Sequence, residues 1–131
     1  MEVALTTNLP GAGLTLRQVK RFADGSGYAT DLAIDSYPFA ASFPFSFEPF
    51  PLEQFVTELR DLDRTLDGAA TLKPMWEAPF IRLAANGRGA IVVSGDLLWT
   101  DQRLRFEFMT DQTCLRPLIA DLERLPLIPA V

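Results

Sequence analysis

The apolar residues of this chain change their spacing three times, and these changes limit the fold more than any other feature. Residues 14–47 alternate between apolar and polar with a period of two, and residues 52–66 take helical spacing. Strand-like runs return in residues 69–108, and helical spacing returns in residues 115–125. A period of two is typical of a half-buried strand, and a spacing of three and four is typical of an amphipathic helix. The sequence therefore predicts an α+β fold in the order strands, helix, strands, helix.

We expect the strands to form one mostly antiparallel sheet of about six or seven strands, with both amphipathic helices on one face. A length of 131 residues fits a single domain over residues 1–131. Breakers at Pro10, Gly11 and Gly13 suggest that residues 1–13 are a loose lead-in. Residues 126–131 are expected to be a tail after the last helix.

The first two strands are predicted to form a hairpin around the Asp-Gly-Ser-Gly turn at residues 24–27. In the second strand, one apolar face carries Tyr28, Thr30, Leu32 and Ile34. We expect Phe22 to pair with Tyr28. The opposite, charged face of the hairpin would then carry Arg17, Arg21, Asp31 and Asp35.

Residues 39–47 alternate phenylalanine or alanine with smaller residues and predict a third strand, whose phenylalanines we assign to the core. Pro44 has no N–H to donate, so this strand should lie at a sheet edge or contain a bulge. In the second half we expect a short strand within residues 69–76 and a strand over residues 80–85. Residues 90–99 are apolar on both faces, which favours either a central strand or a bulge at Gly95-Asp96.

The helices are predicted over residues 51–66 and 113–125. Gly68 is expected to take the left-handed conformation that ends the first helix, and Thr110 or Asp111 to cap the second. The two apolar stripes consist of Leu52, Phe55, Val56, Leu59, Leu62 and Leu66, and of Leu115, Leu118, Ile119, Leu122 and Leu125.

The two halves of the chain match each other at a shift of about 63 residues. Phe43 and Phe45 correspond to Phe106 and Phe108, and the two leucine-rich stripes correspond in the same way. Each half therefore consists of a hairpin, a Phe-x-Phe strand and a helix. An internal duplication and a chance match of common patterns both explain this similarity.

Composition excludes several functions. The chain has no histidine and one cysteine, Cys114, so histidine-based catalytic triads and an intramolecular disulfide are ruled out. We predict a protein that is not an enzyme and that uses no metal or cofactor. A net charge of −5 makes a nucleic acid an unsuitable partner. The chain shows no signal peptide and no run of ~20 apolar residues, so we expect a cytoplasmic protein without membrane contact.

Several segments in the second half of the chain resemble those of a known protein family. Residues 77–83 (Glu-Ala-Pro-Phe-Ile-Arg-Leu), then Gly87-x-Gly89, then residues 104–113 (Leu-Arg-Phe-Glu-Phe-Met-Thr-Asp-Gln-Thr) precede the last helix. With the helix over residues 50–66, this arrangement resembles the WapI-type immunity proteins of bacterial polymorphic toxin systems. The resemblance covers roughly residues 14–125 and implies a non-catalytic protein that binds and neutralises a cognate toxin.

Such a toxin would be cationic if it acts on an anionic substrate, and an acidic immunity protein would complement it. The candidate partner-binding residues are Asp31, Asp35, Glu58, Asp61 and Asp63. We prefer the strand pair Asp31 and Asp35, because a sheet holds its side chains rigidly. Two alternatives stay open: a small-molecule binder with Trp76 or Trp99 lining a pocket between sheet and helices, and a homodimeric domain without a separate ligand.

Overall fold

The computed structural model describes residues 1–75 and 79–131, in which eight strands form two four-stranded antiparallel sheets. The N-terminal sheet contains β1 (Val3–Thr6), β2 (Ala12–Arg21), β3 (Tyr28–Ser36) and β4 (Phe39–Phe47). The C-terminal sheet contains β5 (Ala69–Leu72), β6 (Phe80–Ala85), β7 (Ala90–Trp99) and β8 (Gln102–Asp111). In both sheets the strands are adjacent in chain order.

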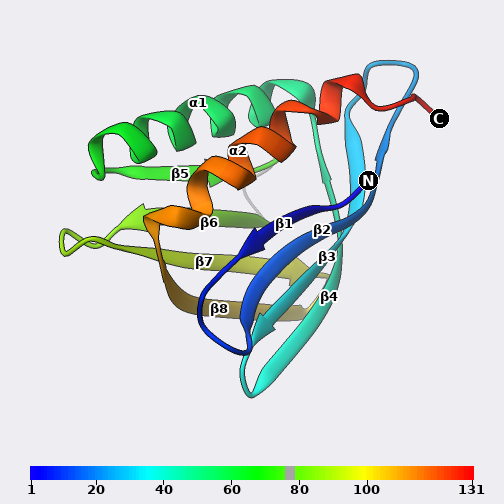
Figure 1. Ribbon diagram of the computed structural model, residues 1–131. Coiled ribbons are helices and arrows are strands. Elements are labelled where there is room, and N and C mark those ends of the chain that lie inside the picture. The colour runs from blue at the N-terminus through cyan, green and yellow to red at the C-terminus, as the bar shows by residue number, and fades with distance from the viewer. Residues whose placement is uncertain (76–78) are drawn as a thin grey trace.

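Two α-helices complete the fold (Figure 1). Helix α1 (Pro49–Thr65) connects the two sheets, and α2 (Leu115–Glu123) follows the C-terminal sheet. Short 3-10 turns, η1 (Gln112–Cys114) and η2 (Leu125–Leu127), flank α2. The predicted α+β class, the order of elements and the two amphipathic helices are confirmed.

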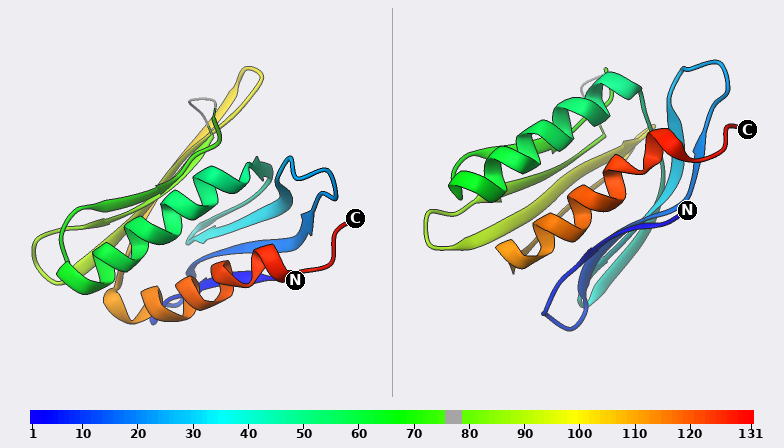
Figure 2. Two further views of the ribbon diagram at one scale, coloured as in Figure 1. Left: turned by 90° about the horizontal axis from the view of Figure 1, so that it is seen from above. Right: turned by 45° about the horizontal axis from the view of Figure 1, so that its top comes forward.

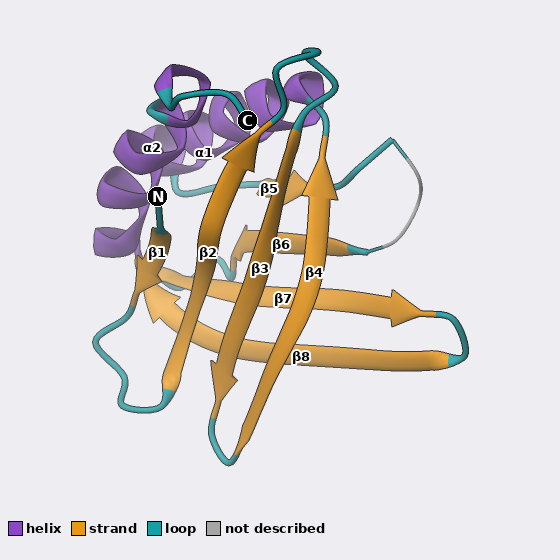
Figure 3. Cartoon of the chain, turned by 90° about the vertical axis from the view of Figure 1, so that its right-hand side faces the viewer, coloured by secondary structure: helices purple, strands orange, loops and turns teal. Residues whose placement is uncertain are grey.

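The prediction of a single sheet of six or seven strands is wrong. The strands of one sheet cross those of the other (Figure 3). Buried side chains from both sheets and both helices form one continuous core. Alternation along a strand shows which side chains are buried, but it does not show whether consecutive strands share a sheet. Here α1 separates β4 from β5 and starts a new sheet.

The two helices run side by side along one side of the molecule (Figure 2). Helix α1 packs beside β5, and α2 packs beside β1. Each helix therefore contacts the edge strand of the sheet that it does not directly follow. Because α1 packs on β5 and α2 packs on β1, the two halves of the chain share one core.

Both halves have the same order of elements, four strands and then a helix, which agrees with the internal repeat. Phe43 and Phe45 lie on β4, the last strand before α1, and Phe106 and Phe108 lie on β8, the last strand before α2. Strand β7 lies between β6 and β8 in continuous register, so the central-strand alternative is the one that holds.

Strand β2 contains a bulge that the sequence did not reveal. The register shifts between Arg17 and Lys20, and Gln18 has a positive φ of 51°. Arg17 faces Asp31, as expected, but Arg21 rather than Phe22 faces Tyr28. A bulge adds one residue to a strand and so reverses which side chains point inward beyond it.

The two chain ends are also better ordered than predicted. Residues 1–13 contain β1, whose Val3 and Leu5 are buried in the core. At the other end, the Arg21 Nε donates to the Ile128 carbonyl at 2.8 Å, and the Val131 N–H donates to the Arg21 carbonyl at 2.8 Å. Arg21 therefore holds the C-terminal segment and does not face Asp35.

The helix ends differ in detail from expectation. Helix α1 begins at Pro49, and Leu66 already takes the left-handed conformation after its last turn, with φ 53°, two residues ahead of Gly68, whose φ of 83° is left-handed as predicted. The Leu66 N–H donates to the Leu62 carbonyl at 2.8 Å, which closes the helix before Gly68 is reached. At η1 the Asp111 carboxylate accepts from the Thr113 N–H at 2.9 Å, as the predicted cap requires.

Candidate functional site

A surface hollow lies between β4 and β8, each an edge strand of its sheet, and we call it the β4–β8 groove. One part has a volume of about 450 Å³ and the other about 390 Å³, and both are lined by Ala41 and Leu104. The first part also includes Phe43, Pro44, Leu97 and Trp99, and the second includes Tyr37, Pro38, Phe39 and Phe106. The groove is therefore mostly apolar, although it is open to solvent.

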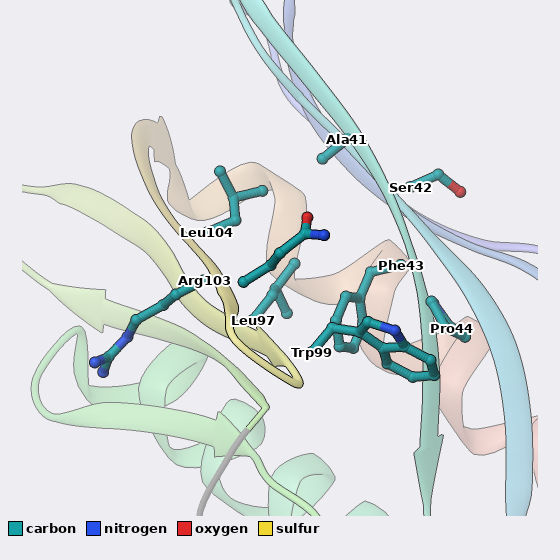
Figure 4. Close-up of a pocket in the computed structure, with 9 residues that line it drawn as sticks. Ala41, Ser42, Phe43, Pro44, Leu97, Trp99, Arg103 and Leu104 are labelled. Carbon is teal, nitrogen blue, oxygen red and sulfur yellow. The ribbon is translucent and has the colours of Figure 1, made fainter.

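Trp99 closes one end of the groove (Figure 4). It lies at the end of β7, two residues beyond the buried Leu97, and its side chain is 57% exposed. Its indole stands edge-on against the Phe43 ring, with centroids 6.1 Å apart and planes at 89°. The tip of the β7–β8 hairpin is thereby packed against β4.

Tyr37 and Phe39 stand at the opposite end, on the β3–β4 hairpin, and are 85% and 74% exposed. The sequence pattern assigns Phe39 to the core with the other phenylalanines of its strand. That assignment is wrong because the start of β4 extends past the opposing sheet, so only Phe43, Phe45 and Phe47 are covered.

The loop between β1 and β2 supports this hairpin. The Tyr37 N–H donates to the Gly11 carbonyl at 2.9 Å. Gly11 has a φ of +75°, and a Cβ there would stand 2.8 Å from the Tyr37 Cβ. Only glycine combines this backbone conformation with so close an approach.

Arg103 lines the groove but directs its charge away from it, as Figure 4 shows. Its Nε donates to the Asp96 carboxylate at 2.8 Å, and the Arg105 Nε lies 3.8 Å from the same carboxylate. The hydrogen bonds from Arg103 hold the pKa of Asp96 below its usual range. Both arginines are thus directed toward a carboxylate on the outer face of the C-terminal sheet.

The predicted strand pair lies elsewhere, on the outer face of the N-terminal sheet. Asp31 and Asp35 are both exposed on β3, where Asp31 faces Arg17 and Asp35 faces Gly13. Across residues 1–75 and 79–131, neither carboxylate forms an ion pair within 4.0 Å.

The three predicted residues of α1 have internal partners. The Glu58 carboxylate accepts from the Thr71 N–H of β5 at 3.1 Å. Asp61 pairs with Arg64 at 2.9 Å, and Asp63 pairs with Arg116 of α2 at 3.3 Å. The structure therefore does not bring the five candidate acidic residues together: two face outward from β3, and three belong to α1.

The other predicted candidates are placed as follows. Trp76 lies outside the described residues. Trp99 lines a pocket, but this pocket lies between two sheet edges and not between sheet and helices. Cys114 is buried, and this burial raises the pKa of its thiol to about 11.

Two negative findings apply to the part of the chain that the structure describes. No group of three or more His, Cys, Asp or Glu side chains there could hold a metal ion. None of its helices is long and apolar enough to cross a membrane.

Sequence reasoning missed most of the β4–β8 groove. Trp99 was a candidate because of its residue type, but Tyr37, Phe39 and Leu104 carried no separate signal, since an exposed residue at a strand end alternates like a buried one. Only the crossing of the two sheets brings these residues around one hollow.

Comparison with known proteins gives one match. No curated protein and no solved structure matches the chain. The model of the immunity protein WapI-like family matches residues 11–125, which include β2 to β8 and both α-helices. The chain therefore belongs to the WapI-like immunity protein family.

Proposed function

We propose that this protein is an immunity protein that binds a cognate toxin in a stoichiometric complex and blocks its action. The observation that carries the proposal is the family match over residues 11–125. This match includes nearly the whole two-sheet core, so it concerns the complete domain and not a short motif. Neutralisation would take place in the cytoplasm of the cell that makes the toxin.

The proposed mechanism is non-catalytic. The chain has no histidine, and the pKa of Cys114, raised to about 11 by burial, keeps this thiol protonated near neutral pH. A protonated thiol is a poor nucleophile. Neutralisation would then depend on binding alone, with one immunity protein occupied for each toxin molecule.

The proposed toxin is cationic. This chain has a net charge of −5, and opposite charges accelerate the encounter of two proteins. Asp31 and Asp35 are the preferred steering residues, because they lack ion-pair partners among the described residues while Asp61 and Asp63 are paired. Steering acts over distance, so these residues need not lie at the centre of the interface.

Growth rescue tests the function. A candidate toxin domain, taken from a gene adjacent to the gene of this protein in its host, is expressed from one inducible plasmid and this protein from a second. We expect growth to be restored only when both are present, and the two proteins to elute together in size-exclusion chromatography. Toxicity that is unchanged by this protein, with no common peak, would contradict the proposal.

A small-molecule binder is the second candidate, because Trp99 lines an open hollow of about 450 Å³. A ligand that this protein carries from its host would appear in native mass spectrometry as a constant added mass. Toxin neutralisation without such a mass favours the first proposal.

A further inference from the structure

We infer that the β4–β8 groove is the surface that grips the toxin, and that its occupant is a basic segment of the toxin that inserts an apolar side chain. This inference rests on the proposed function and names the binding surface. Four observations support it: the exposed aromatic residues, the contacts that order them, the open sheet edges and the charges around the groove.

The exposed aromatic residues are the first observation. Tyr37, Phe39 and Trp99 are each more than half exposed, and all three line the same groove. Single exposed apolar residues are normal on a protein surface, but a group of them around one hollow marks a binding surface. Tyrosine and tryptophan also dominate the binding energy of protein interfaces.

The second observation is that contacts within the protein hold the Trp99 ring and the backbone at Tyr37. Trp99 packs edge-on against Phe43, and the Tyr37 backbone is hydrogen-bonded to the Gly11 carbonyl. An aromatic side chain that is already ordered loses little conformational entropy when a partner binds. This part of the groove is therefore preorganised for binding in the unbound protein.

The third observation concerns the edges of the two sheets. The edge strands β1 and β5 are covered by α2 and α1, and the Thr71 N–H of β5 is bonded to Glu58. The other two edge strands are β4 and β8, which border the groove. An edge strand presents unpaired N–H and C=O groups that another polypeptide can match. This favours a protein segment over a small apolar ligand.

The charge around the groove defines the chemistry of the segment. Glu107 lines the groove, and Asp101 lies two residues beyond Trp99. Neither carboxylate forms an ion pair within 4.0 Å among the described residues, whereas Arg103 and Arg105 both lie within 4.0 Å of the Asp96 carboxylate. The available charge is thus negative, which complements a basic segment.

The same charges argue against a second copy of this chain. In a symmetric dimer the same patch meets itself. The acidic groups around one groove would then approach those around the other, and like charges that face each other oppose binding.

The experiment measures binding of the purified toxin domain to variants of this protein by surface plasmon resonance. Trp99→Ala and Phe39→Ala remove aromatic groups from the two ends of the groove. We expect each to raise the Kd by about 30-fold or more, as the loss of an interface hot spot does. Glu107→Lys should slow association, because it reverses one charge on the groove.

The controls are matched to these changes. Leu98→Ala and Met109→Ala remove apolar residues that are 45% and 46% exposed on β7 and β8 but do not line the groove, and both should leave the Kd within about threefold. Trp99→Phe keeps an aromatic ring and should recover part of the affinity. Thermal unfolding and circular dichroism of each variant establish that it is folded.

Each outcome decides a different point. A folded Trp99→Ala variant that binds as the wild type does would overturn the groove and leave the immunity function standing. A wild type that neither binds nor neutralises the toxin domain would overturn both. A wild type that is dimeric alone, and that becomes monomeric through Trp99→Ala, would make a second copy the occupant and overturn the basic segment.

Discussion

The ring of Phe106 on β8 lies directly over the backbone of Gly95 on β7, the residue that it faces across the two strands. A Cβ at Gly95 would overlap the Cε1 atom of that ring. Gly95, which the sequence marked as a possible bulge, instead leaves room for the buried Phe106 ring. The pairing of β7 with β6 and β8 continues past Gly95 without a shift in register.

Gly95→Ala should therefore destabilise the protein by about 1–3 kcal/mol, the range for overpacking a core. Urea denaturation followed by circular dichroism measures the change. Gly13→Ala is the control, since the nearest atom to a Cβ there, the Leu5 carbonyl oxygen, is 3.7 Å away. We expect Gly95→Ala combined with Phe106→Leu to recover part of the loss; an unaffected midpoint in Gly95→Ala alone would disprove the close packing.

Truncating one buried leucine in either helix should lower the free energy of unfolding substantially. Leu59 on α1 and Leu122 on α2 are fully buried in the shared core. Leu59→Ala and Leu122→Ala should each lower the free energy of unfolding by about 2–5 kcal/mol. The exposed Leu127 provides the comparison, and Leu127→Ala should change it by less than about 0.5 kcal/mol. If either buried leucine behaved like Leu127, its helix would not belong to the core.

Alkaline pH should weaken the fold through Cys114. Burial raises the pKa of this thiol from 9.0 to about 11, so the unfolded chain loses its proton at a lower pH than the folded chain. Stability is then complete below about pH 9 and falls as the pH rises toward 11. Equilibrium unfolding between pH 7 and 11 tests this, with Cys114→Ala as the variant in which the slope should become shallower.

Most single strands could be predicted from the sequence, because alternation and turn residues are local signals. Residues 39–47, 80–85 and 90–99 were predicted as strands with the observed bounds. Pro44 also indicated correctly that its strand lies at a sheet edge. These features depend on the backbone and on the nearest neighbours in the chain.

The features that the sequence did not predict are those that depend on distant parts of the chain. The division into two sheets follows from how α1 directs the chain between β4 and β5. The bulge at Gln18 changes the phase of β2 without a glycine or proline to mark it. The groove forms where the middle of β4 meets the hairpin of β7 and β8, and no local sequence pattern indicates this contact.

Steering by Asp31 and Asp35 makes a kinetic prediction. The double change Asp31→Asn with Asp35→Asn should slow association with the toxin domain and leave the thermal midpoint nearly unchanged, because both side chains are exposed. Arg17→Gln should have the opposite effect, since it removes a positive charge opposite Asp31. Stopped-flow mixing at several salt concentrations measures both rates.

The dependence of the association rate on salt concentration can disprove steering by Asp31 and Asp35. The Debye length falls from about 10 Å at 0.1 M to about 3 Å at 1 M, so steering should weaken over this range. An association rate that depends neither on salt nor on the two aspartates would exclude this face of β3 from the encounter.

Stoichiometric inhibition is the most direct test of the proposed function. The toxin domain is held at fixed concentration, this protein is added in increasing amounts, and the residual activity of the toxin is measured beside the heat of binding. We predict that activity falls in proportion to the protein added and reaches zero at one molecule per toxin molecule. Inactivation by a small fraction of an equivalent would indicate catalysis, and full activity at several equivalents would show that this protein does not neutralise that toxin.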